Sequence, residues 1–285
     1  MDASVAELLE LLDVRPLGDG IYQGIPSNDP LRRVFGGQLL GQALAAASLT
    51  TPPDAYCHSL HAYFLRPGKP GRPIDYEVAV MRDGQRFAAR KVVAVQRDEP
   101  VFELTASFEA DTAGPSHSEP MPDVPLPETF APEAERMAAL LQHMPEHRRE
   151  FFSRPLPIEY AWVDPRLPTD TTPSFGPVRS WMRIRDRLPD DVHLHRALLA
   201  YASDMGALEP ALRAVGVSHA DPDLALASLD HALWFHRPFR ADEWLLFSGW
   251  PVSVSAGRGL SRAVVHTREG VHVASLTQEA LMRPR

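Results

Sequence analysis

Residues 228–239, SLDHALWFHRPF, decide how the rest of the chain is interpreted. The stretch sets a hydroxyl, an acid and two histidines among bulky apolar side chains. It has a twin in the first half of the chain, HSLHAYFLRPGKPG at residues 58–71, and the two align at an offset of 171. The offset nearly persists downstream, where Arg86 and Arg90 match Arg258 and Arg262. An order kept over this distance indicates an internal duplication rather than a chance match.

The same order of elements is expected in each half. An Ala/Leu-rich segment with helical spacing precedes each twin, at residues 36–48 and 194–212. Runs with strand character follow, at residues 74–81, 87–96, 244–254 and 259–266. A proline-rich segment at residues 111–133 separates the halves and has the composition of a linker. The pattern is one helix followed by antiparallel strands, twice.

This pattern predicts an α+β fold in which each curved antiparallel sheet wraps one helix and buries its apolar face. Such a unit is a hotdog, and the chain is expected to be a double hotdog. We expect a first unit at residues 1–110, a linker region at 111–150 and a second unit at 151–285. A duplication of this kind need not repeat the active residues, because one copy can keep the chemistry while the other completes the pocket.

Composition restricts the partners. The 285 residues carry a net charge of −8, so the basic surface that nucleic-acid binding requires is missing. The lone Cys57 excludes an internal disulfide and any multi-cysteine metal site. The first residues are acidic and helical in spacing, unlike a signal peptide, no apolar run approaches the ~20 residues of a membrane span, and the last residues are not a peroxisomal Ser-Lys-Leu signal. We expect a cytoplasmic protein.

Several common motifs are absent or weak. There is no G-x-S-x-G, P-loop or dinucleotide fingerprint. HMPEH, from His143 to His147, resembles a zinc pattern, but Pro145 would break the helix that the pattern needs, so no metal is expected. Cys57 is interpreted as a small buried side chain rather than a nucleophile. Gly36 and Gly37 open a predicted helix, where free N–H groups could meet a carbonyl or phosphate; a tight turn explains them equally well.

Two polar residues stand out from the apolar pattern. Asp204 borders the apolar stripe of the second predicted helix, and Gln278 lies on the apolar face of the last predicted strand. A buried acid or amide requires hydrogen-bond partners or a function. In residues 228–239, strict alternation puts Ser228 on the opposite face from Leu233 and Phe235. The cluster is thus predicted to be one strand whose polar groups are divided between two faces, with its histidines serving packing or pairing.

At this point the chain resembles the acyl-CoA thioesterase II family over nearly its whole length. The resemblance is carried by RVFGGQLLGQAL, HSLHAYFLRPG, SLDHALWFHRPF, EWLLF, GRGLSRA and VASLTQEALMR. It implies hydrolysis of fatty acyl-CoA to fatty acid and CoA, with no metal or redox cofactor and with a homo-oligomer, a dimer or tetramer, as the assembly. The family's aspartate, hydroxyl and glutamine fall on Asp204, Ser228 and Gln278.

The resemblance also implies supporting residues. A functionally sensitive histidine of the family falls on His58. Because the chain has only two lysines, arginines such as Arg32, Arg33 or Arg90 are expected to meet the CoA phosphates.

Two other interpretations stay open on the sequence. One is a different hotdog enzyme, such as an enoyl-CoA hydratase or an acyl-carrier-protein thioesterase; a hydratase normally pairs an acid with a histidine, and no partner for Asp204 stands out. The other is a non-catalytic acyl-CoA sensor or scaffold that uses the same pocket. Within the hydrolase interpretation, Asp204 could act as a general base on water or as a nucleophile that forms a mixed anhydride.

Overall fold

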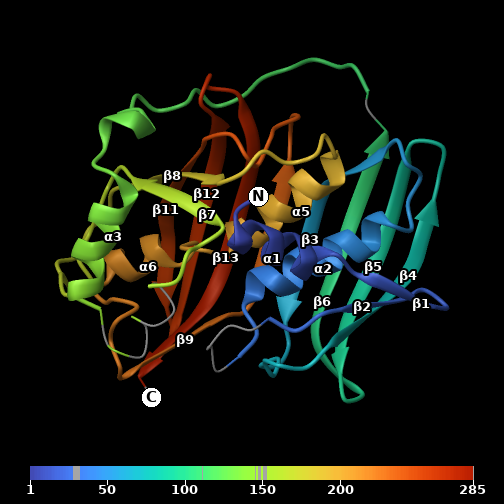
Figure 1. Cartoon of the computed structure of the whole chain (residues 1–285), viewed down its shortest axis with the longest axis horizontal. Helices are drawn as coiled ribbons and strands as arrows, with labels where there is room; N and C mark the ends of the chain where they lie inside the picture. Colours follow the sequence, from blue (N-terminus) through green and yellow to red (C-terminus); the bar gives the residue numbers. More distant parts are fainter. Residues whose placement is uncertain (28–32, 111, 145, 147–148, 150–152, 285) are drawn as a thin grey trace.

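The computed structural model describes residues 1–27, 33–110, 112–144, 146, 149 and 153–284. It is a double hotdog: a curved antiparallel sheet wraps two helices that lie side by side on its concave face (Figure 1). The first half contributes α2 (Gly36–Ser48) and the strands β1 (Arg15–Gly18), β2 (Ile21–Gly24), β3 (Ala55–Phe64), β4 (Ile74–Asp83), β5 (Phe87–Gln96) and β6 (Glu99–Ala110).

The second half repeats this plan with additions. It contributes the helices α5 (Val192–Ser203) and α6 (Glu209–Ala214) and the strands β7 (Ile158–Trp162), β8 (Val178–Ile184), β9 (Leu224–Ser228), β10 (Asp230–Phe235), β11 (Leu245–Ser255), β12 (Arg258–Thr267) and β13 (His272–Pro284). The strand order is β1-β2-β4-β5-β6-β3-β10-β13-β12-β11-β8-β7, and β9 pairs with β13. The strands predicted at residues 74–81, 87–96, 244–254 and 259–266 are confirmed to within two residues at each end.

The duplication appears as a pseudo-twofold axis where β3 meets β10. Leu60 pairs with Leu233 and Ala62 pairs with His231, so the two pairs exchange under the offset of 171 found in the sequence. His61 pairs with Ala232 and maps onto itself, which puts the axis at that pair. The two halves are therefore joined edge to edge in register by their matching strands.

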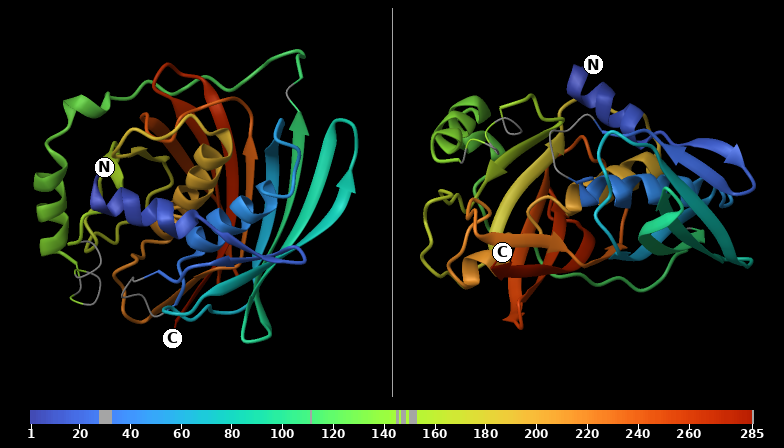
Figure 2. Two further views of the ribbon diagram at one scale, coloured as in Figure 1. Left: turned by 45° about the vertical axis from the view of Figure 1, so that its right-hand side comes forward. Right: turned by 90° about the horizontal axis from the view of Figure 1, so that it is seen from below.

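The two central helices approach each other closely because α2 presents glycines to α5. A Cβ built on Gly41 would stand 2.6 Å from Leu12 Cδ2 and 3.2 Å from the Ala197 carbonyl oxygen. The helices and the strands around them form the main core, which includes Leu40, Leu44, Leu60, Tyr76, Phe102, Phe108, Leu199, Leu233 and Leu276. Figure 2 shows both helices enclosed between the two arms of the sheet.

The predicted N-terminal helix is present as α1 (Ala3–Leu12), and its position is informative. Asp2 caps it by accepting from the Ser4 N–H at 2.8 Å. Its buried face, including Val5 and Leu8, joins a second core cluster with Ile158, Met182 and other residues of the second half. The first residues of the chain thus cover the second hotdog. None of the helices that the structure describes is long and apolar enough to cross a membrane.

The predicted linker region of residues 111–150 contains more structure than its composition suggested. Residues 112–126 have no helix or strand and run across the outside of the molecule (Figure 1), and η1 (Pro127–Thr129) and α3 (Glu133–Gln142) follow. The Trp181 indole N–H donates to the Pro125 carbonyl at 2.9 Å, and Arg237 Nη2 donates to Ser116 Oγ at 2.8 Å. Side chains of the second half therefore hold this segment.

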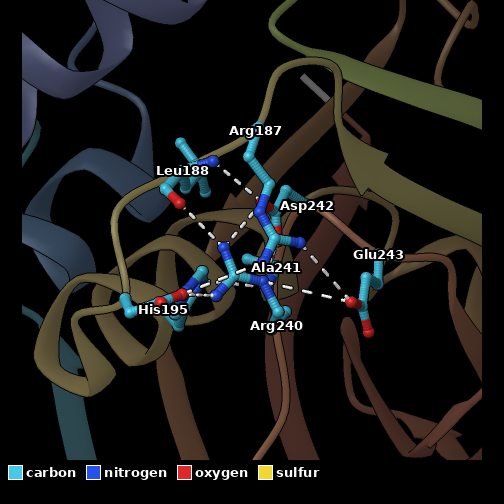
Figure 3. Close-up of polar contacts among 8 residues, drawn as sticks. Arg187, Leu188, His195, Arg240, Ala241, Asp242 and Glu243 are labelled. Atoms are coloured by element: carbon cyan, nitrogen blue, oxygen red, sulfur yellow. Dashed lines mark hydrogen bonds and ion pairs between the residues drawn. The ribbon is translucent and has the colours of Figure 1, made fainter.

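A buried ion pair fixes the segment that leads into α5 (Figure 3). Arg240 Nε and Nη2 donate to the two oxygens of Asp242 at 2.9 Å each, and Asp242 also accepts from the Leu188 N–H at 2.8 Å. Burial alone would raise the pKa of Asp242, but the hydrogen bonds from Arg240 and Leu188 outweigh it and lower that pKa. The Ala241 N–H donates to Nδ1 of His195, within α5, at 3.1 Å. The helix is thereby anchored to the β10–β11 connection.

The close approach of the helices predicts the effect of filling Gly41. Gly41→Val places three carbons where the Leu12 side chain and the Ala197 carbonyl stand, so we expect a loss of about 1–3 kcal/mol in the free energy of unfolding. Urea denaturation measures it. Gly114→Val is the matched control, because no atom lies within 4 Å of a Cβ at Gly114. Valine has a higher helix propensity than glycine, so without a steric clash Gly41→Val would not be expected to destabilise the protein. Equal stability of the two variants would therefore contradict this account.

Candidate active site

Asp204 lies at the end of α5 rather than inside a long helix. The sequence predicted one helix over residues 194–212, and this is wrong: α5 ends at Ser203 and α6 begins at Glu209. Gly206 has a φ of +80°, a conformation that favours glycine and does not continue a helix. Asp204 is therefore the C-cap residue, and its half-buried carboxylate projects beyond the helix end.

Three donors from different parts of the chain converge on this carboxylate. Oδ1 of Asp204 accepts from Ser228 Oγ at 3.0 Å and from Gln278 Nε2 at 2.9 Å. Oδ2 accepts from the backbone N–H of Gly37 at 3.1 Å. Gln278 Nε2 is also 3.0 Å from Ser228 Oγ. The structure thus brings together all three residues that the sequence selected as catalytic, and adds the start of α2 to them.

The glycines that open α2 allow this approach. A Cβ on Gly36 would lie 2.7 Å from Asp204 Oδ2, and one on Gly37 would lie 2.2 Å from the Tyr201 carbonyl oxygen. Larger residues would push the helix away from the carboxylate. The N-terminus of α2 carries a partial positive charge, which favours a carboxylate in front of it. The site therefore lies between the two halves, with an anion from one facing the helix start of the other.

Residues 228–239 depart from the single strand predicted for them. Ser228 ends β9 and Asp230 begins β10. On β13, Ala280 pairs with Ser228 and Thr277 with Ala232, so three residues of one strand face two of the other. This is a β-bulge, and the extra residue reverses the alternation of faces. Ser228 and His231 consequently both reach Gln278.

His231 lies against the candidate site, a position that the sequence did not predict. Its side chain is 1% exposed, Nδ1 lies 2.5 Å from Gln278 Oε1, and Nε2 lies 3.0 Å from Ser203 Oγ. Burial lowers the pKa of His231, despite the opposing charges of Asp204 and Asp230. No sequence signal exposed this contact, because a bulge is not visible in hydrophobic alternation. His236, by contrast, bonds Ser275 Oγ on the outer part of the sheet.

Two predicted supporting residues, His58 and Arg90, do not lie at the site. The end of β3 that reaches the site is marked by Phe64, because a Cβ on Gly36 would lie 2.9 Å from the Phe64 ring. His58 is six residues away on that strand, about 20 Å at the usual rise, and it contacts Ser107 Oγ at 2.8 Å. Arg90 is 1% exposed and bonds Asp83, Thr50 and backbone carbonyls. The structure therefore places neither His58 nor the Arg90 guanidinium beside the three catalytic candidates.

Arg33 is better placed than Arg90. It is exposed, and its guanidinium donates to the carbonyl of Leu226 on β9, two residues from Ser228. Arg32 lies outside the described residues, as do Pro145 and His147 of HMPEH; His143 caps the end of α3. Within the described ranges, no group of three or more His, Cys, Asp or Glu side chains is arranged to hold a metal.

The first half carries a matching backbone with different side chains. Its bulge lies between Cys57 and Ser59 on β3, opposite β6. The position of Asp204 is matched by the C-cap Leu49, that of Ser228 by Cys57, that of His231 by Leu60 and that of Gln278 by Ala106. These residues offer no carboxylate or amide. The fold and this single polar centre between its halves place the chain in the class of hotdog proteins.

Comparison with known proteins gives the family. Residues 25–109 match the model described as the acyl-CoA thioesterase N-terminal domain, and residues 126–282 match that of the C-terminal domain. Acyl-CoA thioesterase 2 of Haemophilus influenzae is 34% identical over 97% of this chain and 96% of its own. Human acyl-coenzyme A thioesterase 8 is 34% identical over 96% and 88%. The chain belongs to the acyl-CoA thioesterase family and is a thioester hydrolase.

Solved structures agree with this assignment. The acyl-CoA thioesterase II of Mycobacterium marinum is 37% identical, with a TM-score of 0.78 over 97% of this chain and 98% of that one. A tesB protein of Mycobacterium avium subspecies paratuberculosis is 30% identical, with a TM-score of 0.81 over 99% and 100%.

The position of Cys57 predicts its reactivity. The thiol is 1% exposed, and burial raises its pKa to about 12, so it is protonated at neutral pH. We expect the native protein to react with a disulfide reagent at pH 8 far more slowly than the protein unfolded in urea. The unfolded protein should show one reactive thiol per chain. Cys57→Ala should keep kcat within about twofold. Rapid native labelling that abolishes activity would instead indicate a catalytic thiol.

Proposed function

We propose that this enzyme hydrolyses fatty acyl-CoA through a water molecule positioned by Asp204, Ser228 and Gln278. The supporting observation is the convergence of three hydrogen-bond donors on the Asp204 carboxylate at the start of α2. Three donors fix the direction of this carboxylate. A carboxylate held in one orientation between two halves of a pocket is suited to accept a proton from water.

The proposed step is acyl transfer to water. The water oxygen attacks the thioester carbonyl carbon while its proton passes to Asp204. The carbonyl oxygen gains the negative charge, which the positive end of the α2 dipole stabilises. The tetrahedral intermediate then collapses, the C–S bond breaks, and the CoA thiolate leaves and takes up a proton. The products are the fatty acid and CoA.

Water is favoured over Asp204 as the attacking group. Both carboxylate oxygens already accept hydrogen bonds, one from Gly37 and two from Ser228 and Gln278. Accepting a proton needs only a free lone pair on a carboxylate oxygen, whereas attack on carbon requires that oxygen to leave its donors and move to bonding distance from the carbonyl. The mixed-anhydride route is therefore the less favoured alternative.

The two ends of the substrate have separate candidate sites. For the CoA phosphates we propose Arg33, whose guanidinium is exposed beside β9. For the acyl chain we propose a cavity of about 620 Å³ between α1 and residues 154–158. Tyr201 and Met205, which lie close to Asp204 in the chain, are among its lining residues. Its aliphatic wall includes Leu8, Leu11, Ile25, Leu156 and Ile158, and the carboxylates of Asp2, Glu7 and Glu10 also line it.

A hydratase and a sensor are the rival functions. A hydratase pairs an acid with a histidine that acts on substrate, and His231 is a candidate that the sequence did not reveal. However, both ring nitrogens of His231 have protein partners and the side chain is buried behind Gln278. A sensor would bind acyl-CoA without releasing CoA, and it would not require these aligned polar groups.

We also propose a cytoplasmic location and a homo-oligomer. The free thiol of Cys57 is compatible with a reducing compartment. For self-association we propose the outer face of the first half, where Tyr63, Val80, Met81 and Phe87 are exposed. Light scattering coupled to gel filtration measures the assembly mass.

Asp204→Asn tests the proposed base. Asparagine keeps the shape but cannot take a proton from water, so we expect kcat to fall by about 10²–10⁴-fold with the fold retained. The measurement is free CoA released from a panel of acyl-CoAs. Asp191→Asn, at the opposite end of α5, is the matched control because asparagine also caps helices well. Near-normal turnover by folded Asp204→Asn would refute the assignment, and binding without release in the wild type would favour the sensor.

Ile25→Trp tests the acyl cavity. Ile25 is partly exposed in the cavity wall, and a tryptophan there shortens the space for the chain. Because a buried methylene is worth about 0.8 kcal/mol, kcat/KM should fall roughly tenfold for every two methylenes displaced. We expect the loss with a long-chain substrate and not with a short one, and Ile25→Val should change neither greatly. Equal losses at all chain lengths would place the acyl chain elsewhere.

A further inference from the structure

The hydrogen bonds around Gln278 continue away from the carboxylate into the core. Gln278 is 2% exposed, and its Oε1 lies 2.5 Å from His231 Nδ1. His231 Nε2 lies 3.0 Å from Ser203 Oγ, and Ser203 Oγ is 2.9 Å from the carbonyl of Ala200 in α5. The chain of contacts therefore runs from Asp204 through Gln278 and His231 back to the helix that carries Asp204.

The donors and acceptors in this chain can be assigned. An ionised Asp204 only accepts, so the amide nitrogen of Gln278 faces it and the amide oxygen faces His231. That oxygen also only accepts, so His231 must carry a proton on Nδ1. Burial lowers the pKa of His231, which favours the neutral ring, so Nε2 must accept. The Ser203 hydroxyl then donates its single proton to Nε2 rather than to the Ala200 carbonyl, both of which lie within hydrogen-bond distance. His231 thus has one required tautomer.

The fold itself does not require a histidine at this position. Under the pseudo-twofold axis His231 corresponds to Leu60, which is fully buried beside the equivalent bulge. A leucine of similar volume therefore fits this backbone environment. A buried histidine is costly unless its nitrogens are paired, so its presence in one half only needs a cause other than packing.

We propose that His231 is a positioning residue for the hydrolysis, and that it holds the Gln278 amide in the one orientation that donates to Asp204 and Ser228. The inference rests on the proposed function of Asp204. Without the Nδ1–H donor, the Gln278 amide is free to turn its oxygen toward the carboxylate, where two acceptors repel. Asp204 then loses one donor, and Ser228 loses the N–H that fixes its hydroxyl.

Three variants of His231 separate this role from packing. His231→Leu keeps the volume and removes the donor. His231→Asn keeps an N–H near the position of Nδ1, whereas His231→Gln carries its N–H one bond further, toward Ser203. We expect kcat to fall about 10–100-fold in the Leu and Gln variants, with KM within about threefold, and to recover to within about fivefold of the wild type in the Asn variant.

The pH profile of kcat supplies a readout that loose packing would not move. Hydrogen bonds to an ionised carboxylate favour its charged form, so their loss favours protonation. We expect the acid limb of the profile to move to higher pH in the Leu and Gln variants and to return in the Asn variant. The charged groups near His231 are Asp204 and Asp230, and none of the three variants changes either.

The outcomes distinguish this inference from the proposed function. Wild-type kcat and pH profile in folded His231→Leu, together with an inactive Asp204→Asn, would overturn the inference alone. An active Asp204→Asn would overturn the proposed function and the inference with it. A loss in His231→Leu that His231→Asn does not restore would assign His231 a steric role. If His231→Leu does not fold, equal kcat of the Asn and Gln variants overturns the proposal.

Discussion

The close contact between α2 and α5 is the constraint on which the site depends. Where α2 begins, a Cβ on Gly37 would stand 2.2 Å from the Tyr201 carbonyl, so only glycine permits the observed distance. The contact sets the start of one helix against the end of the other. A carboxylate at the C-terminus of its own helix is in an unfavourable field, and the N-terminus of α2 compensates for it. The carboxylate of Asp204 meets the start of α2 only because the two halves are packed this tightly.

The duplicated backbone provides two equivalent positions for an active site, one in each half, and only the side chains make the two positions different. Each half has a helix that ends before its strands and a bulge at the matching point, between Cys57 and Ser59 or between Ser228 and Ala232. In the first half Leu49, Cys57, Leu60 and Ala106 occupy the matching positions. The second half has a carboxylate, a hydroxyl, an imidazole and an amide there. Since the polar groups bond one another, the change from apolar to polar has to involve the whole set.

The sequence predicted the parts of the fold that follow local rules. The offset of 171, α2 and the burial of alternate residues on β13 follow from periodicity, and the pairing of β3 with β10 confirms the offset. It did not predict features that depend on a single backbone departure. The positive φ of Gly206 ends α5, and the bulge after Ser228 turns His231 inward; neither changes the apolar pattern. Arg90 and His58 were misplaced because a motif does not report which end of a strand, or which face, meets the site.

Asp204 and Gln278 stood out in the sequence because each is a polar group at an apolar stripe or face, whereas Ser228 was selected only by the resemblance to the family, and His231 was missed. His231 was missed because residues 228–239 were predicted to be one regular strand, on which a histidine can be assigned to pairing or packing. A network of this kind is stable only when each donor has an acceptor, since one unpaired group in a low dielectric costs more than a hydrogen bond gains. The two N–H groups of Gln278, the hydroxyls of Ser228 and Ser203, and Nδ1–H of His231 meet that condition in one arrangement. The arrangement spans α5, β9, β10 and β13 and receives the Gly37 N–H from α2, so the direction of the carboxylate is a property of both halves together.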